Sequence, residues 1–240
     1  MPKGQQARGR AVASVSAGLE AMVAARRRAE SVARMRSLAA GSGLPRSSDS
    51  APPGTERCDV CRAPIPDDHR HMLHLVDRRI VCTCEPCWAL HSGDAEYRPT
   101  GMRTVWLDGF TCPDETWAAF GIPIGLAFFM RSTVTNSVVA FYPSPAGATE
   151  SELSLEAWDA LVADNPVLEQ LDTDAEALVV NRMSSPAEYA IVPIDQCYAL
   201  VGLIKTRWEG ISGGRAIEEA VPQFFSALRE RAVSAAEALR

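Results

Sequence analysis

The hydrophobic pattern separates an N-terminal segment with little apolar surface from a longer segment with regular apolar runs. Between Val12 and Ala40 the composition is helical, but the larger apolar residues form only a thin stripe. Residues 41–54 are rich in Gly, Ser and Pro, which is typical of a flexible linker. We therefore expect residues 1–57 to be a disordered or partly helical extension.

Beyond about Tyr97 the apolar runs predict a folded domain. Runs at 122–130, 137–142, 177–183 and 189–193 contain many β-branched and aromatic residues and predict strands, the first two paired. A turn is expected at 143–148, an apolar run at 198–205 leads to Trp208, and a loop is expected at 210–214.

Three helices are predicted in the same part of the chain. A short helix at 112–121 has Pro113 near its start and acidic residues in its first turn. Ser154 can cap a second helix that ends near Asn165. A last amphipathic helix is predicted from about Arg215 to the C-terminus, with Pro222 as a kink or restart. Strands and helices are mixed without β-α-β alternation, so we predict an α+β fold.

Between these parts, residues 58–97 predict a small module. The sequence from Arg70 to Val76 alternates loosely, residues 77–79 suit a turn, and residues 80–82 return, so the segment is expected to form a hairpin. The predicted organisation is an extension at 1–57, a zinc-ribbon-like module at 58–97 and an α+β domain at 98–240.

Composition and charge limit the possible functions. The hydrophobic fraction of 47% and charged fraction of 22% are ordinary for a soluble protein. No apolar run approaches the ~18 residues of a membrane span, and the start lacks a secretory signal, so a cytoplasmic location is expected. In that reducing compartment, clustered cysteines are more often metal ligands than disulfides.

Charge is distributed unevenly along the chain. Residues 1–57 carry ten basic and four acidic residues, whereas the remainder carries 14 basic and 26 acidic residues. The acidic remainder argues against nucleic-acid binding by the folded part. Arg26–Arg28 could form a nucleic-acid or membrane-surface patch, but a solvated helix face explains them more simply. The Arg-rich start also imitates an organelle transit peptide.

The strongest chemical signal is a cluster of metal-ligand residues. Five of the seven cysteines and all four histidines fall between Cys58 and His91. Two Cys-x-x-Cys pairs, Cys58/Cys61 and Cys84/Cys87, are separated by 22 residues, slightly more than the usual zinc-site spacing of about 15–20, and Cys82 in place of Cys84 would give 20. Four thiolates close a tetrahedron around Zn²⁺ and leave no open position, so we predict a structural zinc site.

Several residues near these pairs remain alternatives. Cys82 and His71 are possible alternate ligands, and Cys82 as a fifth thiol would favour an iron–sulfur cluster or an exchangeable metal. His69 and His71 would share one face of an extended strand and His74 the other. Because four cysteines already satisfy zinc, we expect these histidines to be exposed or outside the direct ligand set. His91 resembles a helix-end cation.

Other candidates for chemistry are weaker. Cys112 at a helix N-terminus would have a lowered pKa, and Cys197 is expected in the core among strand residues. Asp108, Asp114 and Glu115 could supply an acidic pair, although first-turn acids explain the last two. No histidine follows His91, so no Ser/His/Asp triad can be formed beyond it.

The chain resembles an uncharacterised bacterial family found in gene clusters for uptake-type [NiFe] hydrogenases. The resemblance covers about residues 56–230 and rests on seven segments: Cys58–Cys61, His69–His71, Cys82–Cys87, Ile122–Phe129, Ala140–Ser151, Val192–Tyr198 and Trp208–Gly214. It implies an accessory role near a metalloenzyme.

Three functions follow as hypotheses. The first is a non-enzymatic, metal-binding accessory protein that docks on hydrogenase subunits or their maturation proteins. Trp88 and Trp106 could help if exposed, although burial in the core is the simpler expectation for each. The second is a protein that carries an iron–sulfur cluster or a labile metal for redox or transfer. The third is a zinc-ribbon nucleic-acid binder, which the acidic body disfavours.

Overall fold

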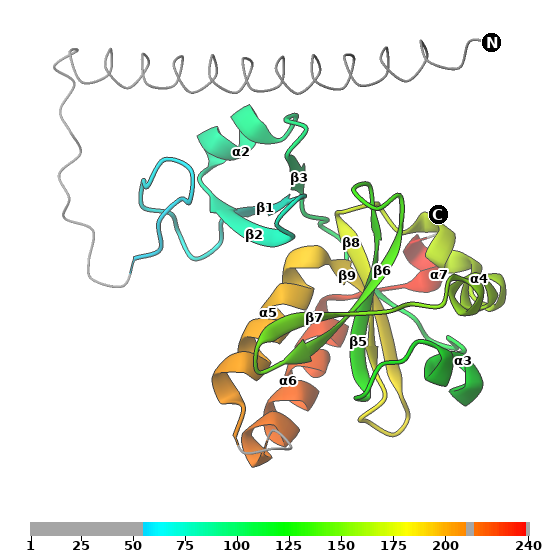
Figure 1. Ribbon diagram of the computed structural model, residues 1–240. Helices are drawn as coiled ribbons and strands as arrows, with labels where there is room; N and C mark the ends of the chain where they lie inside the picture. Colours follow the sequence, from blue (N-terminus) through cyan, green and yellow to red (C-terminus); the bar gives the residue numbers. More distant parts are fainter. Residues whose placement is uncertain (1–54, 210–213, 239–240) are drawn as a thin grey trace, which may run out of the picture. The chain divides into compact units, whose positions relative to one another are not determined.

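A computed structural model describes residues 55–209 and 214–238, which belong to one compact unit spanning 53–240 (Figure 1). The predictions for the extension at 1–54 and for most of the 210–214 loop lie outside the described residues. The described part is mixed α+β, which confirms the predicted fold class. Among its helices, none is long and apolar enough to cross a membrane.

A three-stranded antiparallel sheet forms the first part. It contains β2 (Arg79–Thr83), β1 (Arg70–His74) and β3 (Tyr97–Pro99) in that order. The predicted hairpin is confirmed as β1 and β2, which pair from Arg70↔Thr83 to His74↔Arg79. Helix α2 (Glu85–His91) follows β2 directly. Strand β3 spans the predicted domain boundary at 97/98, and the three proposed domain limits stay predictions.

A seven-stranded sheet forms the second part. Its spatial order is β10 (Val233–Ser234), β4 (Val105–Trp106), β9 (Glu188–Pro193), β8 (Glu176–Asn181), β5 (Leu126–Ser132), β6 (Ser137–Ser144) and β7 (Gly147–Ser151). All neighbours are antiparallel except β10 and β4. The pairing of the first two predicted strands is confirmed as β5 and β6.

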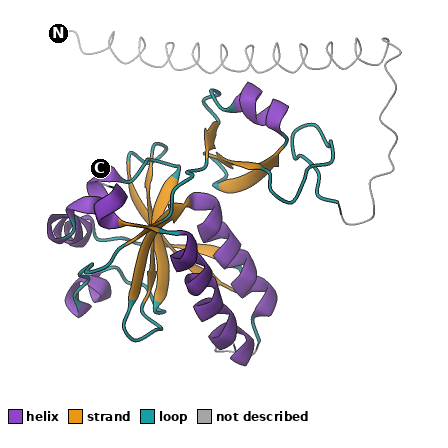
Figure 2. Ribbon diagram, turned by 180° about the vertical axis from the view of Figure 1, so that it is seen from behind, coloured by secondary structure: helices purple, strands orange, loops and turns teal. Residues whose placement is uncertain are grey.

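Helices cover both faces of this sheet (Figures 1 and 2). One face packs against α5 (Ile194–Arg207) and α6 (Arg215–Arg231), and the other against α3 (Asp114–Ala119), α4 (Leu155–Asp164), the 3₁₀ helix η1 (Pro166–Gln170) and α7 (Ala235–Ala238). Because both faces are buried, the central strands are almost continuously apolar. In β5, Phe128 faces the α5 side and Phe129 the α4 side.

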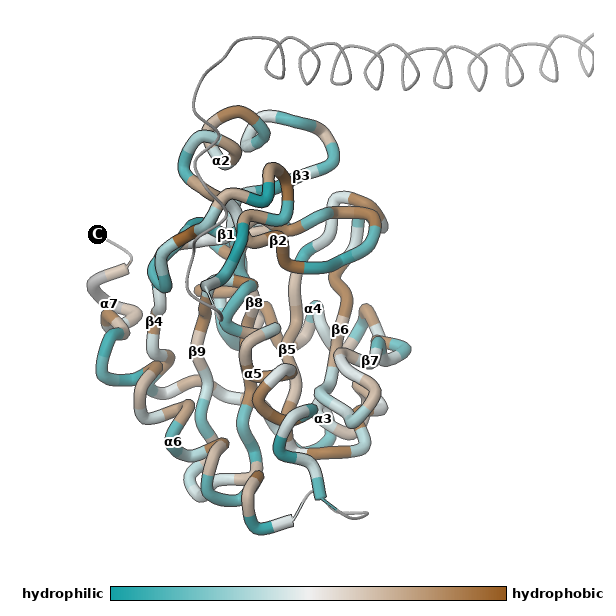
Figure 3. Tube along the Cα trace, turned by 90° about the vertical axis from the view of Figure 1, so that its left-hand side faces the viewer, coloured by the Kyte–Doolittle hydropathy of each residue, from teal (hydrophilic) through white to brown (hydrophobic). Residues whose placement is uncertain are grey.

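The helix predictions are largely confirmed. Helix α3 ends before Gly121, whose φ of 64° is in the left-handed region that favours glycine. Ser154 accepts a hydrogen bond from the Ala157 N–H at 3.3 Å and caps α4. The last helix ends at Arg231 rather than at the C-terminus, and Pro222 lies inside it. Hydropathy along the chain changes repeatedly in α5 and α6, which are buried on one side only (Figure 3).

Two further predictions about the elements are wrong. The expected turn at 143–148 is shorter, because Pro143 and Ser144 end β6 and Gly147 begins β7. Cys197 lies in helix α5 rather than among strand residues, although it is in the core as expected. The buried residues of α5 recur every three or four positions, at Ile194, Cys197, Leu200/Val201 and Ile204. The residues between them from 198 to 203 are also largely non-polar, so the run cannot be distinguished from a buried strand by pattern alone.

Candidate metal centre

The first cysteine pair lies in a tight turn before β1. The Cys58 N–H donates to the Ala63 carbonyl, and the Arg62 N–H donates to the Cys58 carbonyl, both at 2.8 Å. Arg62 has a φ of 66°, which turns the chain back so that a bridge forms between Arg57 and Pro64. The same turn therefore carries both Cys58 and Cys61.

The second cysteine pair lies where β2 passes into α2. Cys84 occupies the N-cap position, its carbonyl accepts from the Trp88 N–H at 2.9 Å, and Cys87 lies in the first turn. Pro86 suits this start because the first helical positions have no intrahelical use for an N–H. The helix therefore places the second pair beside the turn that carries the first pair.

The four predicted ligands converge. The sulfur atoms of Cys58, Cys61, Cys84 and Cys87 all lie within 4.8 Å of one another. The Cys61 and Cys84 sulfurs are 3.6 Å apart, close to the edge of about 3.8 Å expected for tetrahedral zinc with Zn–S bonds of about 2.3 Å. These residues thus fit a thiophilic ion, and a four-thiolate set of this kind would stabilise the fold by crosslinking the two turns.

Burial and hydrogen bonding give the four thiols different acidities. Burial alone would raise the pKa of Cys58, but backbone hydrogen bonds, chiefly from Cys61 and Cys84, outweigh it and lower the pKa to about 6. Burial raises the pKa of Cys61 and of Cys87. At neutral pH Cys58 is therefore already in the thiolate form in which cysteine binds zinc. Cys61 and Cys87 still carry their protons, which metal binding has to release.

The first turn is also tied to β2 through Asp59. The Cys82 N–H donates to Asp59 Oδ2, and the Asp59 N–H donates to the Cys82 carbonyl, both at 2.8 Å. Cys58 and Cys87 then pack with Ile65 in a small cluster of buried residues. This cluster is too small to hold the two turns by apolar burial alone, which is the situation in which structural metals are used.

A family of unknown function, DUF5947, matches residues 57–232. The chain belongs to the DUF5947 family. No curated protein and no solved structure matches it. The match includes all four cysteines and almost the same span as the resemblance noted above, so an uncharacterised family is confirmed.

The DUF5947 chain has a second group of metal-ligand side chains beside the four cysteines. His69, His71 and Cys82 each offer one ligand atom within 4.8 Å of the others. The two alternate ligands, His71 and Cys82, therefore lie together with His69 in a group of their own. Of the two alternatives expected for these histidines, His69 is not exposed, since its side chain is only 5% exposed, but it does lie outside the four-cysteine ligand set.

The other two histidines of the module have local partners. His74 Nδ1 accepts from the Asp77 N–H at 3.1 Å, and its ring contacts that of Tyr97. His91 lies in the last turn of α2, as expected, and its Nδ1 is 2.8 Å from Asp94 Oδ2. Neither belongs to either ligand group among the described residues.

The remaining candidates lie elsewhere. Burial raises the pKa of Cys112, and Arg182 offsets this only in part, so the expected lowering is wrong. Asp114 pairs with Arg182. Asp108 and Glu115 are exposed and belong to neither ligand group. Cys197 is fully buried, and burial raises its pKa well above the usual range.

Sequence reasoning missed Asp195. Its Oδ2 is 3.2 Å from His71 Nδ1, and it comes from the first turn of α5. A first-turn acid is common in helices for electrostatic reasons, so the residue gave no separate signal. Only the packing of α5 beside β1 brings it to the histidine.

Proposed function

We propose that this DUF5947 protein is a non-enzymatic accessory protein in which Cys58, Cys61, Cys84 and Cys87 hold a structural zinc ion. The convergence of four sulfurs within 4.8 Å carries the proposal. Zinc suits the set because it accepts four thiolates in a tetrahedron without redox change. The ion would stabilise a module whose own apolar cluster is small.

Metal analysis of the full chain purified without oxygen tests the zinc assignment. We expect a colourless protein with tightly bound zinc, and Cys87→Ser should lose that ion while Cys112→Ser, a thiol outside both ligand groups, should retain it. A brown protein that contains iron and has a charge-transfer absorption band in the visible range would instead indicate an iron–sulfur cluster. That result would overturn the zinc proposal.

The partner is proposed from the resemblance: subunits of a [NiFe] hydrogenase or its maturation proteins. A docking surface is available near the module, where Leu90 is 73% and Met102 83% exposed. Arg70 joins Met102 to Trp88 in this region, since its guanidinium lies over the Trp88 ring at 4.9 Å and donates to Met102 Sδ at 3.7 Å. Trp106 is buried and is not part of such a surface.

Binding of the full chain to purified hydrogenase components, measured by biolayer interferometry, tests the docking proposal. Leu90→Asp and Met102→Asp should each weaken binding, because charge disrupts an apolar contact. Val134→Asp and Met183→Asp are matched controls, since both residues are exposed apolar side chains outside the module. No binding to any component, or equal loss in controls and test variants, would contradict the proposal.

A further inference from the structure

The group formed by His69, His71 and Cys82 is organised around one face of a strand pair. His71 and Cys82 are directly opposed in the β1–β2 register, and His69 precedes His71 by two residues. Because side chains alternate along an extended chain, all three point to the same side. This is an independent cluster from that of the four cysteines.

His69 has a buried nitrogen without a hydrogen-bond partner. Its Nδ1 is 2.9 Å from the Pro66 carbonyl oxygen, which can only accept, so the ring proton is on Nδ1. Its Nε2 therefore presents a lone pair. Among the described residues, this atom is one of only two buried side-chain nitrogen or oxygen atoms that lack a partner. A fixed imidazole with a buried, unused lone pair is the arrangement of a metal ligand.

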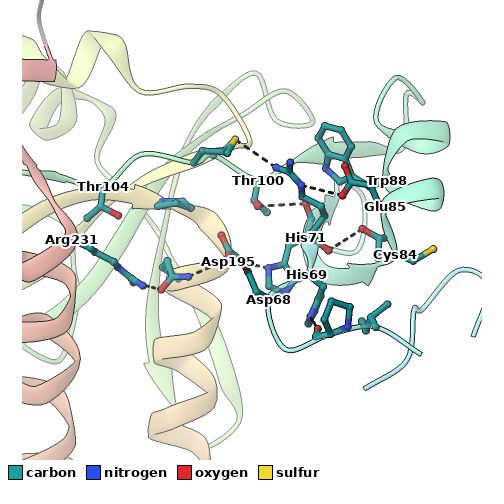
Figure 4. A pocket seen from close by; sticks show the side chains of 18 of the residues that line it. Asp68, His69, His71, Cys84, Glu85, Trp88, Thr100, Thr104, Asp195 and Arg231 are labelled. Carbon is teal, nitrogen blue, oxygen red and sulfur yellow. Dashed lines mark hydrogen bonds and ion pairs between the residues drawn. The ribbon is translucent and has the colours of Figure 1, made fainter. Parts of the chain in front are cut away.

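His71 is oriented by a carboxylate. Asp195 Oδ2 lies 3.2 Å from His71 Nδ1, so the proton is held on Nδ1 and Nε2 is free to coordinate (Figure 4). Carboxylate–histidine–metal arrangements of this kind fix the tautomer and raise ligand basicity. The second partnerless atom among the described residues is Asp195 Oδ1. The two partnerless atoms thus belong to residues that line the same cavity, where a cation would compensate the charge of the carboxylate.

Cys82 completes the set from the adjacent strand. Its backbone is held on both sides by hydrogen bonds to Asp59, which fix the position of its Cα while its side chain can still rotate. The three ligand atoms lie within 4.8 Å of one another. Tetrahedral coordination by nitrogen and sulfur requires separations of about 3.3–3.8 Å, which small side-chain rotations provide.

We propose that His69, His71 and Cys82 form a second metal site for a divalent first-row ion, zinc foremost, with an open fourth position. Two imidazoles and one thiolate suit zinc. His69 and His71 line a cavity of about 590 Å³, into which Figure 4 shows both side chains directed. Three protein ligands leave the fourth position to water or to a donor that enters this cavity.

The two sites differ in what they allow the ion to do. Four thiolates enclose the first ion, whereas the second ion would remain accessible to exchange. The protein would thus carry one fixed ion and one that can be taken up or released. This inference does not depend on the structural zinc proposal, because its ligands are different residues.

Zinc titration of the full chain under anaerobic conditions, followed by desalting and elemental analysis, tests the proposal. We expect two zinc ions per chain in the natural protein and one in Cys82→Ser and in His69→Ala. His74→Ala and Cys112→Ser should retain two, since neither residue belongs to a ligand group. Zinc release to a chromogenic chelator should be biphasic in the natural protein, and the faster phase should be absent in Cys82→Ser.

X-ray absorption spectroscopy at the zinc edge tests the same proposal on the natural protein alone, so it does not depend on whether the variants fold. In the natural protein with two ions, we expect imidazole scattering in addition to sulfur. One ion with sulfur ligands only would overturn the second site and leave the first intact. Two ions in both Cys82→Ser and His69→Ala would also overturn it. A single ion with imidazole ligands in the natural protein would overturn the structural site instead and leave the second site intact.

Discussion

His71 and His74 lie three residues apart on β1, and each has an aspartate beside its Nδ1. For His71 the aspartate is Asp195, whose side chain is 13% exposed, whereas for His74 it is Asp77, which is 59% exposed. A solvated pair of this kind contributes little to stability. The more buried His71–Asp195 pair fixes the imidazole tautomer, so the same residue types have different consequences on the two sides of the strand.

Replacement of Asp195 by asparagine tests this difference. Asparagine keeps the shape but removes the charge that holds the proton on His71 Nδ1. We expect Asp195→Asn to weaken binding of the second zinc ion by about 10–100-fold, measured by competition with a chelator of known affinity. The first ion should be bound as before.

Asp77→Asn is the matched control for this measurement, because it alters an Asp–His contact outside the ligand groups. It should leave the affinity of both ions unchanged. Equal affinities of the second ion in Asp195→Asn and the natural protein would mean that Asp195 does not position His71.

The same residues show how far the sequence leads. Spacing alone predicts that the two Cys-x-x-Cys pairs meet, since a hairpin between them is the simplest connection. Spacing also places His69 and His71 on one face. It does not place Cys82 opposite His71, because that requires the strand register, nor does it bring Asp195 to β1, because that requires the packing of distant elements.

At the level of elements, α5 connects the two sheets. Leu73 of β1 is fully buried within the cluster that contains α5 and α6. Tyr198 of α5 donates its hydroxyl hydrogen to the carbonyl of Arg78, in the turn between β1 and β2. The Arg78 guanidinium in turn pairs with Glu150 of β7. The hairpin is therefore attached to the larger sheet by apolar burial and by hydrogen bonds.

Tyr198 gives this connection a pH dependence. Burial raises its pKa to about 12, above the ordinary value of 10, so the folded state favours the neutral phenol. The contribution of Tyr198 to the free energy of unfolding is fully present below pH 10 and is lost as pH rises from about 10 to 12. We expect the free energy of unfolding to fall by about 2 kcal/mol over this interval.

Urea unfolding of the natural protein and of Tyr198→Phe between pH 8 and 12 measures this effect. Phenylalanine cannot ionise, so the difference in unfolding free energy between the two proteins should change across this interval in favour of the variant. Titration of other groups affects both proteins equally. A difference that is constant with pH would show that Tyr198 does not have a raised pKa.

Helices and strands were predicted correctly where the sequence contains a clear capping residue or a clear apolar–polar alternation. The predictions failed where one apolar pattern fits both a helix and a strand. Ser154 and Gly121 set helix ends by local chemistry that the sequence displays directly. Strands β3 and β10 are too short for any periodicity to emerge, and they exist because a neighbouring strand offers hydrogen bonds. Helix α5 has an unbroken non-polar run from Cys197 to Ile204, so its helical period is hidden.

On the scale of the whole described chain, two kinds of stabilisation are joined. The seven-stranded sheet has a large buried core on each face. The cysteine turns share only the small cluster of Cys58, Ile65 and Cys87. Metal removal should therefore affect the two regions unequally, because burial of apolar surface dominates stability in one and metal coordination in the other.

Hydrogen–deuterium exchange after zinc removal tests this division. Residues 55–66 and α2 should lose protection, since they depend on the metal. The β1–β2 hairpin should retain part of its protection, because Leu73 and Tyr198 attach it to α5 independently of any ion. Strands β5 and β8 should exchange as slowly as before. A uniform increase across all these segments would mean that the metal module and the seven-stranded sheet unfold as one cooperative unit, and that the four thiolates stabilise the whole described chain rather than the turns that carry them.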